Sequence, residues 1–343
     1  MSTEAQTITI SPTGTHEDLT ERIRRAGLLA PRRDYYVLKI TTTLLLMAGC
    51  WVAFFLIGDS WWQLVVAVAL GLTFVQSGFI GHDVGHRQIS HTKQLAQAIG
   101  WVHMNVLMGM TYGWWVNHHN RHHSHPNNLD KDPDTRRRKV IFHVDEVPTK
   151  GATAFGRFVI RHQAVMFFVL LAQEAWRVHA SGFQAARAGT LKRPLTELGL
   201  TVLHGLLYLG AVLAVLPPVK AIVFILLNQA IFGFYLGAVF APNHKGMVVH
   251  RSDVELDWLH RQVLTSRNIR PGRITDFLFG GLNYQIEHHL YPTMPRVNLG
   301  RARPIVRTYC AEHGIPYVEV SAWESYRQVA GFLNEVGAEA TAR

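Results

Sequence analysis

The chain has 343 residues, of which 48% are hydrophobic and only 17% charged, and its apolar residues come in long blocks. This composition excludes an ordinary soluble domain and predicts a membrane protein. The 34 Lys and Arg against 24 Asp and Glu give a formal net charge of +10. Nucleic-acid-binding proteins share such a charge, but the basic residues here flank the apolar blocks, as they do in membrane proteins. We therefore expect a lipid bilayer, and no nucleic acid, as a partner.

The N-terminal residues 1–34 predict no membrane span. Residues 1–15 are rich in Ser and Thr and are expected to be disordered. They contain no apolar stretch typical of a signal peptide, so we expect insertion through internal segments. In residues 16–29 the apolar side chains share one helical face and arginines lie on the others, which predicts a short amphipathic helix on the membrane.

Two pairs of apolar stretches predict four membrane-spanning helices, at 40–57, 61–81, 198–216 and 221–242. Each stretch is close to the about 20 residues that cross a bilayer as a helix. The connections within the pairs are very short, which predicts two helical hairpins. Every strongly basic segment lies away from the two hairpin tips, so both termini are expected in the cytoplasm.

Two further segments predict helices that lie at the membrane surface. Leu95–Trp115 is mostly apolar but contains His103 and several glycines, which favours an interfacial helix over a span. Residues 152–180 mix aromatic and basic side chains, which also predicts a surface helix. The predicted fold class is an all-α integral membrane protein with four transmembrane helices in two hairpins, interfacial helices and a cytoplasmic, histidine-rich cap.

Three short segments beside the apolar stretches are rich in histidine. Their histidines, and one glutamine, are spaced three or four residues apart, so each set shares one face of a helix. The topology drawn from hydropathy and basic residues places all three segments on one side of the membrane. The sets are His82 with His86, His119 with His122 and His123, and Gln285 with His288 and His289.

Seven imidazoles on one side of a membrane predict a metal centre. A zinc site takes four protein ligands or fewer, so seven histidines exceed it. Imidazole also suits iron and copper, and a second metal would use the surplus. We favour two irons. Soluble di-iron bundles use carboxylates with Glu-x-x-His pairs, so a site built from nitrogen ligands would be a different solution.

These motifs resemble the membrane fatty acid desaturase family, over most of the chain from about Tyr36 to Tyr317. The extended third segment, Asn283–Pro295, resembles the front-end branch and its bacterial acyl-lipid and acyl-CoA relatives, in which Gln replaces a first His. We expect a desaturase domain at 35–320, after an N-terminal segment at 1–34 and before a C-terminal tail at 321–343. The resemblance implies a bacterial-type plasma membrane with the catalytic face cytoplasmic.

The resemblance implies an enzyme that uses O2 and two iron ions to introduce a cis double bond into a long acyl chain, carried by CoA or by a lipid. It adds His244, after the last span, to the ligands. Gln285 either binds weakly through its carbonyl oxygen or orients a neighbouring ligand, and both roles stay open. The implied metal ligands are His82, His86, His119, His122, His123, His244, His288 and His289.

Carboxylates near the ligands are expected to hold ring N–H groups, as is common for metal-bound histidines. The candidates are Asp83, Glu287, Asp130 and Asp132. For the last two, a solvated loop is an equal alternative. Other histidines are ambiguous or structural: His118 would replace His119 only by breaking the ligand spacing, His125 also flanks the second set, and we expect structural roles for His91 and His103.

The reaction would need two electrons from outside the chain. The sequence contains no Gly-rich dinucleotide motif and no cysteine cluster, since only Cys50 and Cys310 are present. A ferredoxin or an NAD(P)H-dependent reductase is therefore the expected donor. The basic runs Arg136–Lys139 and Arg296–Arg307 are candidates for docking an acidic donor or a phosphate-bearing acyl carrier. Ordinary charge asymmetry across the membrane explains the same residues and is the favoured explanation.

Three other functions compete with desaturation. A lipid or carotenoid hydroxylase or ketolase would use the same scaffold. A histidine-rich metal transporter, or a haem-binding cytochrome, would need ligands within the spans, where only His204 stands. The position of the double bond, the chain length and the acyl carrier cannot be deduced from these motifs.

Overall fold

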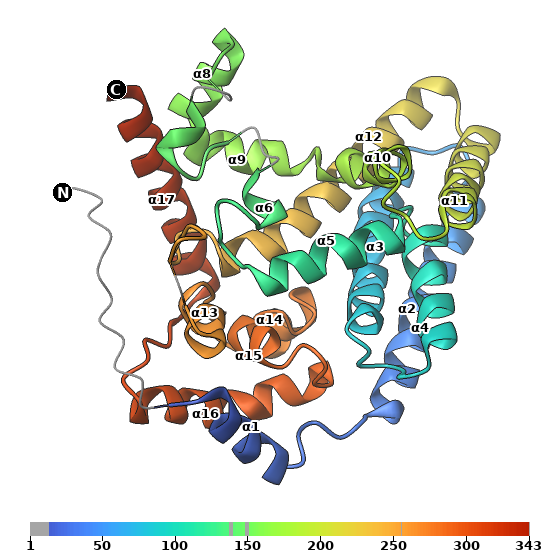
Figure 1. Ribbon diagram of the computed structural model, residues 1–343. Helices are drawn as coiled ribbons and strands as arrows, with labels where there is room; N and C mark the ends of the chain where they lie inside the picture. The colour runs from blue at the N-terminus through green and yellow to red at the C-terminus, as the bar shows by residue number, and fades with distance from the viewer. Residues whose placement is uncertain (1–13, 137–139, 148–150, 255, 343) are drawn as a thin grey trace.

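The long apolar stretches of the sequence form helices. The computed structural model describes residues 14–136, 140–147, 151–254 and 256–342. Four helices are long and apolar enough to cross a membrane, as expected, and a bent helix pair allows a fifth. Large apolar side chains such as Leu56 and Leu206 remain 81% and 67% exposed, which suits contact with lipid. The four are α2 (Arg33–Ile57), α3 (Gln63–Gly85), α11 (Pro194–Val215) and α12 (Pro218–Phe240) (Figure 1).

Helix α3 is the centre of this bundle. It packs against both α2 and α12, and 67% of its apolar window is buried, against 17% for α2 and 22% for α11. At one end, Lys220 Nζ lies 2.7 Å from Asp59 Oδ1, so the start of α12 is joined to the turn between α2 and α3. His82 lies in the last helical turn of α3, at the opposite end of the helix from the connection between α2 and α3.

The segment expected as one interfacial helix at 95–115 is broken. It consists of α4 (Lys93–Gly100), the π-helical η1 (Trp101–Val106) and a loop that leads into α5 (Tyr112–Ser124). In that loop Gly109 has φ +76°, a conformation that favours glycine. The segment 95–115 is not among the candidate spans of the described chain.

The expectation of a single surface helix at 152–180 is wrong. The chain forms α8 (Ala154–Arg161), α9 (Gln163–Leu171) and α10 (Glu174–Arg187) instead. The axis bends by 104° between α8 and α9, because His162 leaves the helical conformation at φ −115° and ψ 23°. Helices α9 and α10 then pack along α12.

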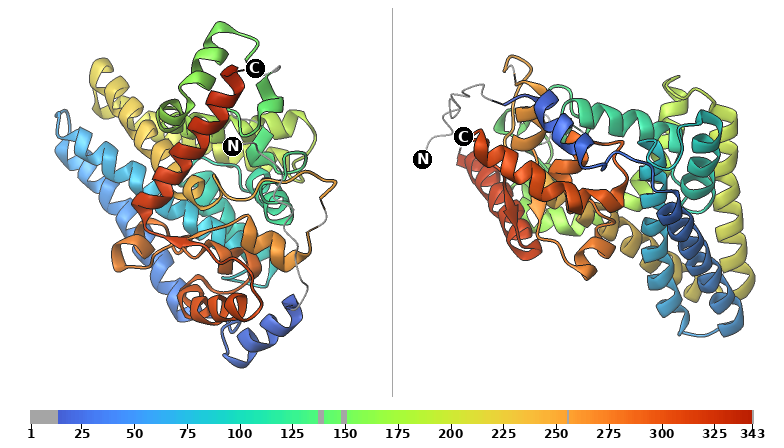
Figure 2. Two further views of the ribbon diagram at one scale, coloured as in Figure 1. Left: turned by 90° about the vertical axis from the view of Figure 1, so that its left-hand side faces the viewer. Right: turned by 90° about the horizontal axis from the view of Figure 1, so that it is seen from below.

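The C-terminal third folds into a separate layer of helices beside the bundle (Figure 2). Its only described strands, β1 (Asn268–Ile269) and β2 (Glu319–Val320), pair in parallel. Short helical turns α6 (Pro133–Arg136), η2 (Val144–Glu146) and η3 (Ala241–Asn243) border this layer. Its helices are α13 (Trp258–Leu264), α14 (Arg273–Leu278), α15 (Gln285–Leu290), α16 (Arg296–Glu312) and α17 (Ala322–Ala342).

Both terminal segments are packed onto the protein. The apolar face of α1 (His16–Arg25) was expected to lie on the membrane, but Leu19 and Ile23 are fully buried in a core shared with α16. The expectation is wrong because α16 covers this face. The C-terminal tail forms α17, whose Val329 and Leu333 pack with the α9 residue Phe167 (Figure 1). The expected disorder at 1–15 falls mainly on residues 1–13, outside the described residues.

The close packing of α12 against α9 and α10 can be tested by substitution. A Cβ atom at Gly233 would lie 2.8 Å from Ala175 N and 2.9 Å from Ala172 O, which are backbone atoms. We expect Gly233→Ala to destabilise the protein by about 1–3 kcal/mol, as overpacking does, and to lower its melting temperature in detergent.

Gly210→Ala in α11 is the matched control, since nothing lies within 4 Å of the new methyl group. It should leave the melting temperature unchanged or raise it slightly, because Ala favours helix over Gly. Equal melting temperatures of the two variants would contradict the close contact of α12 with α9 and α10.

Candidate metal centre

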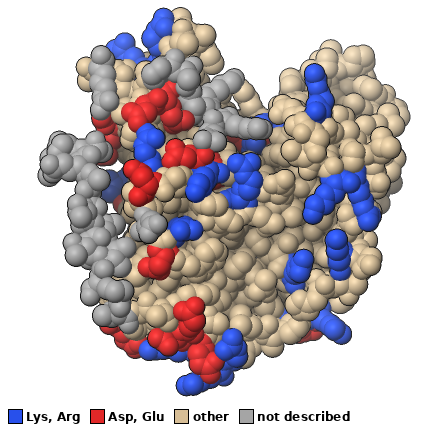
Figure 3. All heavy atoms as spheres, viewed as in Figure 1, with Lys and Arg blue, Asp and Glu red and all other residues tan. Residues whose placement is uncertain are grey.

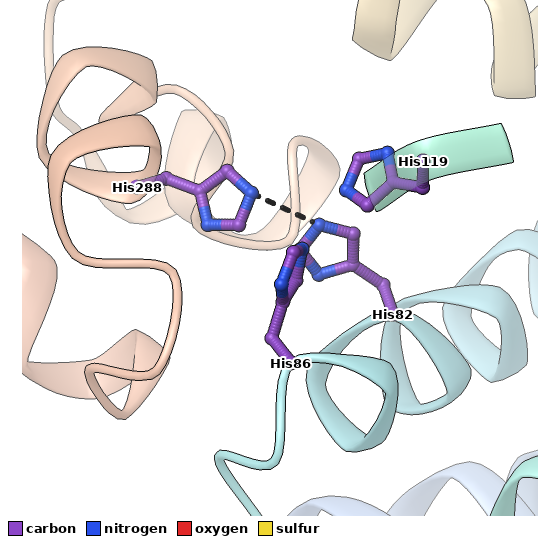
Figure 4. A group of neighbouring side chains, drawn as sticks. All are labelled: His82, His86, His119 and His288. Atoms are coloured by element: carbon purple, nitrogen blue, oxygen red, sulfur yellow. Dashed lines mark hydrogen bonds between the residues drawn. The ribbon is translucent and has the colours of Figure 1, made fainter. Parts of the chain in front are cut away.

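Four histidines from three helices converge in one buried group. The end of α3 supplies His82 and His86, α5 supplies His119, and α15 supplies His288. One ring nitrogen of each lies within 4.8 Å of those of the other three, and Figure 4 shows the rings pointing toward one another. The Nε2 atoms of His82 and His288 are 3.2 Å apart. A metal ion fits between such nitrogen atoms.

A second group lies beside the first. It combines His122 of α5, His244 after α12 and His289 of α15, whose ligand atoms are also within 4.8 Å of one another. The Nε2 atoms of His122 and His244 are 3.3 Å apart. The family-based expectation for His244 therefore agrees with its position among the other candidates.

His123 connects the two groups. Its Nε2 lies 3.1 Å from Nε2 of His119 and 3.1 Å from Nε2 of His288, both in the first group. Its ring stacks on His289 of the second group, with centroids 4.2 Å apart. All eight histidines expected as ligands thus meet in one pocket, arranged as two neighbouring sets.

The pocket favours neutral imidazoles. Burial lowers the pKa of His86 to about 3. Burial, followed by the charges of neighbouring imidazoles, also lowers the pKa of His119, His123, His288 and His289. A neutral imidazole keeps a lone pair for a metal. His122 differs: burial lowers its pKa, but the carboxylates of Asp132 and Asp134 together outweigh burial and raise it.

Several ring nitrogens that point away from the centre are held by acceptors. His82 Nδ1 lies 3.1 Å from Asp83 Oδ1, and His122 Nδ1 lies 3.1 Å from both carboxylate oxygens of Asp132. Because a carboxylate only accepts, Nδ1 carries the proton and Nε2 faces the centre. The expectations for Asp83 and Asp132 agree with these contacts.

Two other acceptors were missed in the sequence. Gln262 Oε1 lies 2.9 Å from His289 Nδ1, and the carbonyl oxygen of Thr265 lies 3.0 Å from His244 Nδ1. Gln262 also donates to the backbone oxygen of His123. No motif or spacing signals these residues, because a lone glutamine and a backbone carbonyl leave no pattern.

The remaining expected carboxylates lie elsewhere. Glu287 is fully buried and accepts hydrogen bonds from Asn268 and Tyr317, which tie β1 and the chain before β2 to α15. Neither partner is an imidazole, so the expectation that Glu287 holds a ring N–H is not met among the described residues. Asp130 accepts from the backbone of Ser252 and faces Arg251 at the surface, as the loop alternative proposed.

Gln285 lies within the second group. Its Nε2 is 2.9 Å from His244 Nε2, and its Oε1 accepts from Asn243. In this orientation the amide contacts a ligand candidate rather than offering its carbonyl to the centre, which favours the orienting role. Together with His119, His122, His244 and other residues it lines a cavity of about 40 Å³.

The histidines expected to be structural or ambiguous lie outside both groups. His118 Nε2 contacts Asp134 at 3.0 Å, while His125 ends α5 and His91 is exposed. His103 contacts the Ser77 hydroxyl at 2.9 Å, and His204 contacts the carbonyl oxygen of Val106 at 2.9 Å. None of these five has a ligand atom in a potential metal-binding group of the described chain.

Unpaired nitrogens support a metal between the rings. The Nε2 atoms of His86 and His289 are buried without a hydrogen-bond partner among the described residues. Leaving a buried polar atom unpaired is costly, and such atoms are rare in native proteins. Lone pairs on the inward-facing ring nitrogens would instead be satisfied by cations, so the donor set fits metal ions that favour nitrogen ligands.

Comparisons with known proteins agree with this arrangement. The chain is 32% identical to an acyl-lipid (9-3)-desaturase of Physcomitrium patens over 93% of this chain and 61% of that protein. It is 29% identical to a delta(5) fatty acid desaturase of Caenorhabditis elegans, over 88% of this chain and 69% of that protein. It is also 29% identical to a delta(8)-fatty-acid desaturase of Arabidopsis thaliana, over 77% and 62%.

The chain thus spans about three fifths to two thirds of the length of these relatives. The family model for fatty acid desaturases matches residues 59–321, which include all eight histidines of the two groups. The chain belongs to the fatty acid desaturase family.

Proposed function

We propose that this chain is an O2-dependent desaturase that introduces a cis double bond into a long acyl chain. The observation that carries the proposal is the meeting of eight buried histidines, from four separate parts of the chain, in two adjacent groups. The names of the relatives, all fatty acid desaturases, support the same reaction.

The two groups would each hold one iron ion. His82, His86, His119 and His288 would bind the first, and His122, His244 and His289 the second, with His123 between them. When bound, an iron pair supplies the activation of O2 needed to take two hydrogens from an unactivated acyl chain. The protein holds the ligand rings in place through Asp83, Asp132, Gln262 and the carbonyl oxygen of Thr265.

An apolar wall beneath His82 would receive the acyl chain. A small cavity there is bordered by His82 itself, by Trp115 and by aliphatic, aromatic and methionine side chains from α3, η1, the loop after η1 and α12. Trp115 also stacks on His119, with ring centroids 4.5 Å apart. Methionine side chains adapt to irregular partners, so they would move aside for an acyl chain. The methionines are Met104, Met108 and Met110.

A polar cleft on the same side would hold the acyl carrier. A cavity of about 570 Å³ opens beside α3, α4 and α5, with Arg87, Lys93, Arg121 and Lys192 on its walls. On the face shown in Figure 3, the visible charges over α4 and α11 are nearly all basic. Four cations around one cleft would attract the phosphate groups of a CoA or phospholipid carrier.

Two arginines of the run Arg296–Arg307 do not fit the expected docking site, whereas Arg301 and Arg307 of the same run are exposed. Arg296 is only 8% exposed and is paired with Asp83, and Arg303 is paired with Glu319. Neither is free for a partner, because each is held by a carboxylate of its own chain. Arg137, Arg138 and Lys139 of the other run lie outside the described residues. A ferredoxin or an NAD(P)H-dependent reductase remains the proposed electron donor.

We further propose that α2–α3 and α11–α12 form two hairpins with the histidines on the cytoplasmic side of a bacterial-type plasma membrane. The ion pair between Lys220 and Asp59 supports a shared side for both tips. The basic segments near the histidine groups favour the cytoplasm for the other side. The proposed desaturase domain at 35–320 would be flanked by the segments at 1–34 and 321–343, of which α1 and α17 pack onto it.

The alternatives are weaker on specific grounds. A transporter would bind metal near the middle of its spans, whereas His82 ends α3 and His244 follows α12. Within the described spans, His204 has a backbone carbonyl as its partner. Hydroxylation or ketolation on the same scaffold remains the competing reaction, and only the product distinguishes it from desaturation.

A histidine substitution tests the ligand assignment. We expect His122→Ala to abolish desaturation and to lower bound iron, because it removes a ligand and unpairs Asp132. Iron per chain is measured by elemental analysis, and activity by unsaturated product. The matched control is His162→Ala, an exposed histidine between α8 and α9 that lies outside both groups, which should keep wild-type iron and activity. Full activity with unchanged iron in His122→Ala would refute the assignment.

Product analysis tests the reaction. Expression in a host with simple, defined lipids should yield acyl chains two mass units lighter per new double bond, and mass spectrometry of derivatised chains locates that bond. The purified chain with substrate and O2 but no reductant system should give no product. Hydroxylated or keto products instead of alkenes would establish the competing reaction.

Cysteine labelling tests the topology. In a variant without Cys50 and Cys310, we expect Val219→Cys, at the exposed start of α12, to react with an impermeant thiol reagent from outside intact cells. Ser124→Cys, exposed at the end of α5, should react only after the membrane is opened. Labelling of both positions from the same side would contradict the two-hairpin arrangement.

A further inference from the structure

Arg296 is a buried arginine that lies outside the proposed set of metal ligands. It follows the third histidine segment by a few residues and begins α16. Arg296 is only 8% exposed, and its Nη2 lies 2.8 Å from Asp83 Oδ2. The other oxygen of the same carboxylate, Oδ1, lies 3.1 Å from His82 Nδ1. Arg296, Asp83 and His82 therefore form a continuous buried chain that ends at the first histidine group.

The position of Arg296 is fixed from several directions. Its Nη1 donates to the carbonyl oxygen of Gly280 at 2.7 Å. Its backbone N–H faces the Tyr36 hydroxyl at 3.0 Å and Gln88 Oε1 at 3.1 Å. Tyr36 donates to Gln88 in turn, at 2.6 Å. Residues from α2 and the chain after α3 thus hold the backbone of Arg296, and the loop before α15 holds its guanidinium.

Glycine is required where the arginine stem passes the loop. Gly281 has φ +81°, and a Cβ atom there would lie 2.5 Å from Arg296 Cγ. The neighbouring Gly280, at φ +58°, presents the carbonyl that Arg296 binds. The loop is therefore shaped around this side chain, in a conformation that other residues rarely adopt.

The Arg296–Asp83 pair is buried and is held by more contacts than a surface ion pair needs. A carboxylate that is 1% exposed is costly without a nearby cation and further hydrogen bonds. The planar guanidinium can bind Asp83 and Gly280 with separate N–H groups, which a lysine ammonium does less well. Arg296 thereby keeps Asp83 oriented, and Asp83 keeps the proton of His82 on Nδ1, so that Nε2 faces the other three rings.

We propose that Arg296 is a positioning residue for the first metal group, which acts on His82 through Asp83 and couples the segment after the third histidine set to α3. The proposal rests on the metal centre proposed above. It assigns Arg296 no contact with substrate or metal. It also differs from a purely structural clamp, because its effect should reach one of the two histidine groups and spare the other.

The test is cobalt(II) binding to the metal-free protein in detergent, followed by visible absorption. We expect the wild type to bind two cobalt ions per chain. Arg296→Gln should weaken binding of one ion about 10- to 100-fold, the range for partners of metal ligands, and leave the other unchanged. Arg296→Lys should restore part of the lost affinity, since it returns a cation to Asp83.

Two variants make the result specific. Arg301→Gln, at an exposed position of the same helix α16, should bind cobalt as the wild type does. Asp83→Asn keeps the size of the side chain and should reproduce the loss of one ion even if Arg296→Gln fails to fold. A purely structural role would lower the melting temperature while the folded protein kept both affinities.

The outcomes separate this inference from the proposed function. Wild-type protein that binds two cobalt ions, together with Arg296→Gln or Asp83→Asn protein that binds both as tightly, overturns the positioning role alone. Wild-type protein that binds no cobalt and yields no unsaturated product overturns the metal centre itself, and the positioning role with it.

Discussion

The proposed site depends on keeping eight imidazoles neutral and turned inward in one buried pocket. Burial lowers the pKa of most of these rings, and acceptors hold the outward nitrogens of His82, His122, His244 and His289. Both effects are needed, because a protonated ring has no lone pair and a freely rotating ring has no fixed direction. The rest of the fold can be understood as the means of bringing these rings and acceptors together.

The membrane bundle contributes stiffness and placement. Helix α3 is packed on two sides, by α2 and α12, so its last turn presents His82 and His86 in fixed positions. The C-terminal layer contributes α15 with His288 and His289, and α13 with Gln262. The layer is fastened to the bundle by buried polar contacts, among them Arg296 with Asp83 and Asn243 with Leu282. Long-range polar contacts therefore set the spacing of ligands that the apolar helices only bring to the same side.

Two of the expectations that were wrong share one cause. The apolar face of α1 was assigned to the membrane, but Leu19 and Ile23 pack on α16. A hydrophobic stripe predicts that something apolar covers it, and does not say whether lipid or protein does so. Arg296 was assigned to docking because it belongs to a basic run, yet it is buried against Asp83. The sequence shows a charge but not the partner that folds onto it.

The sequence by itself determined the four apolar helices, the three histidine segments and their shared side, because hydropathy and helical spacing are local properties. It also carried the resemblance to the desaturase family. Only the tertiary structure decided that the histidines form two groups joined by His123, that Gln262 and Thr265 hold outward nitrogens of His289 and His244, and that Arg296 pairs with Asp83. These contacts join residues far apart in the chain, and neither spacing nor composition records which distant side chains meet.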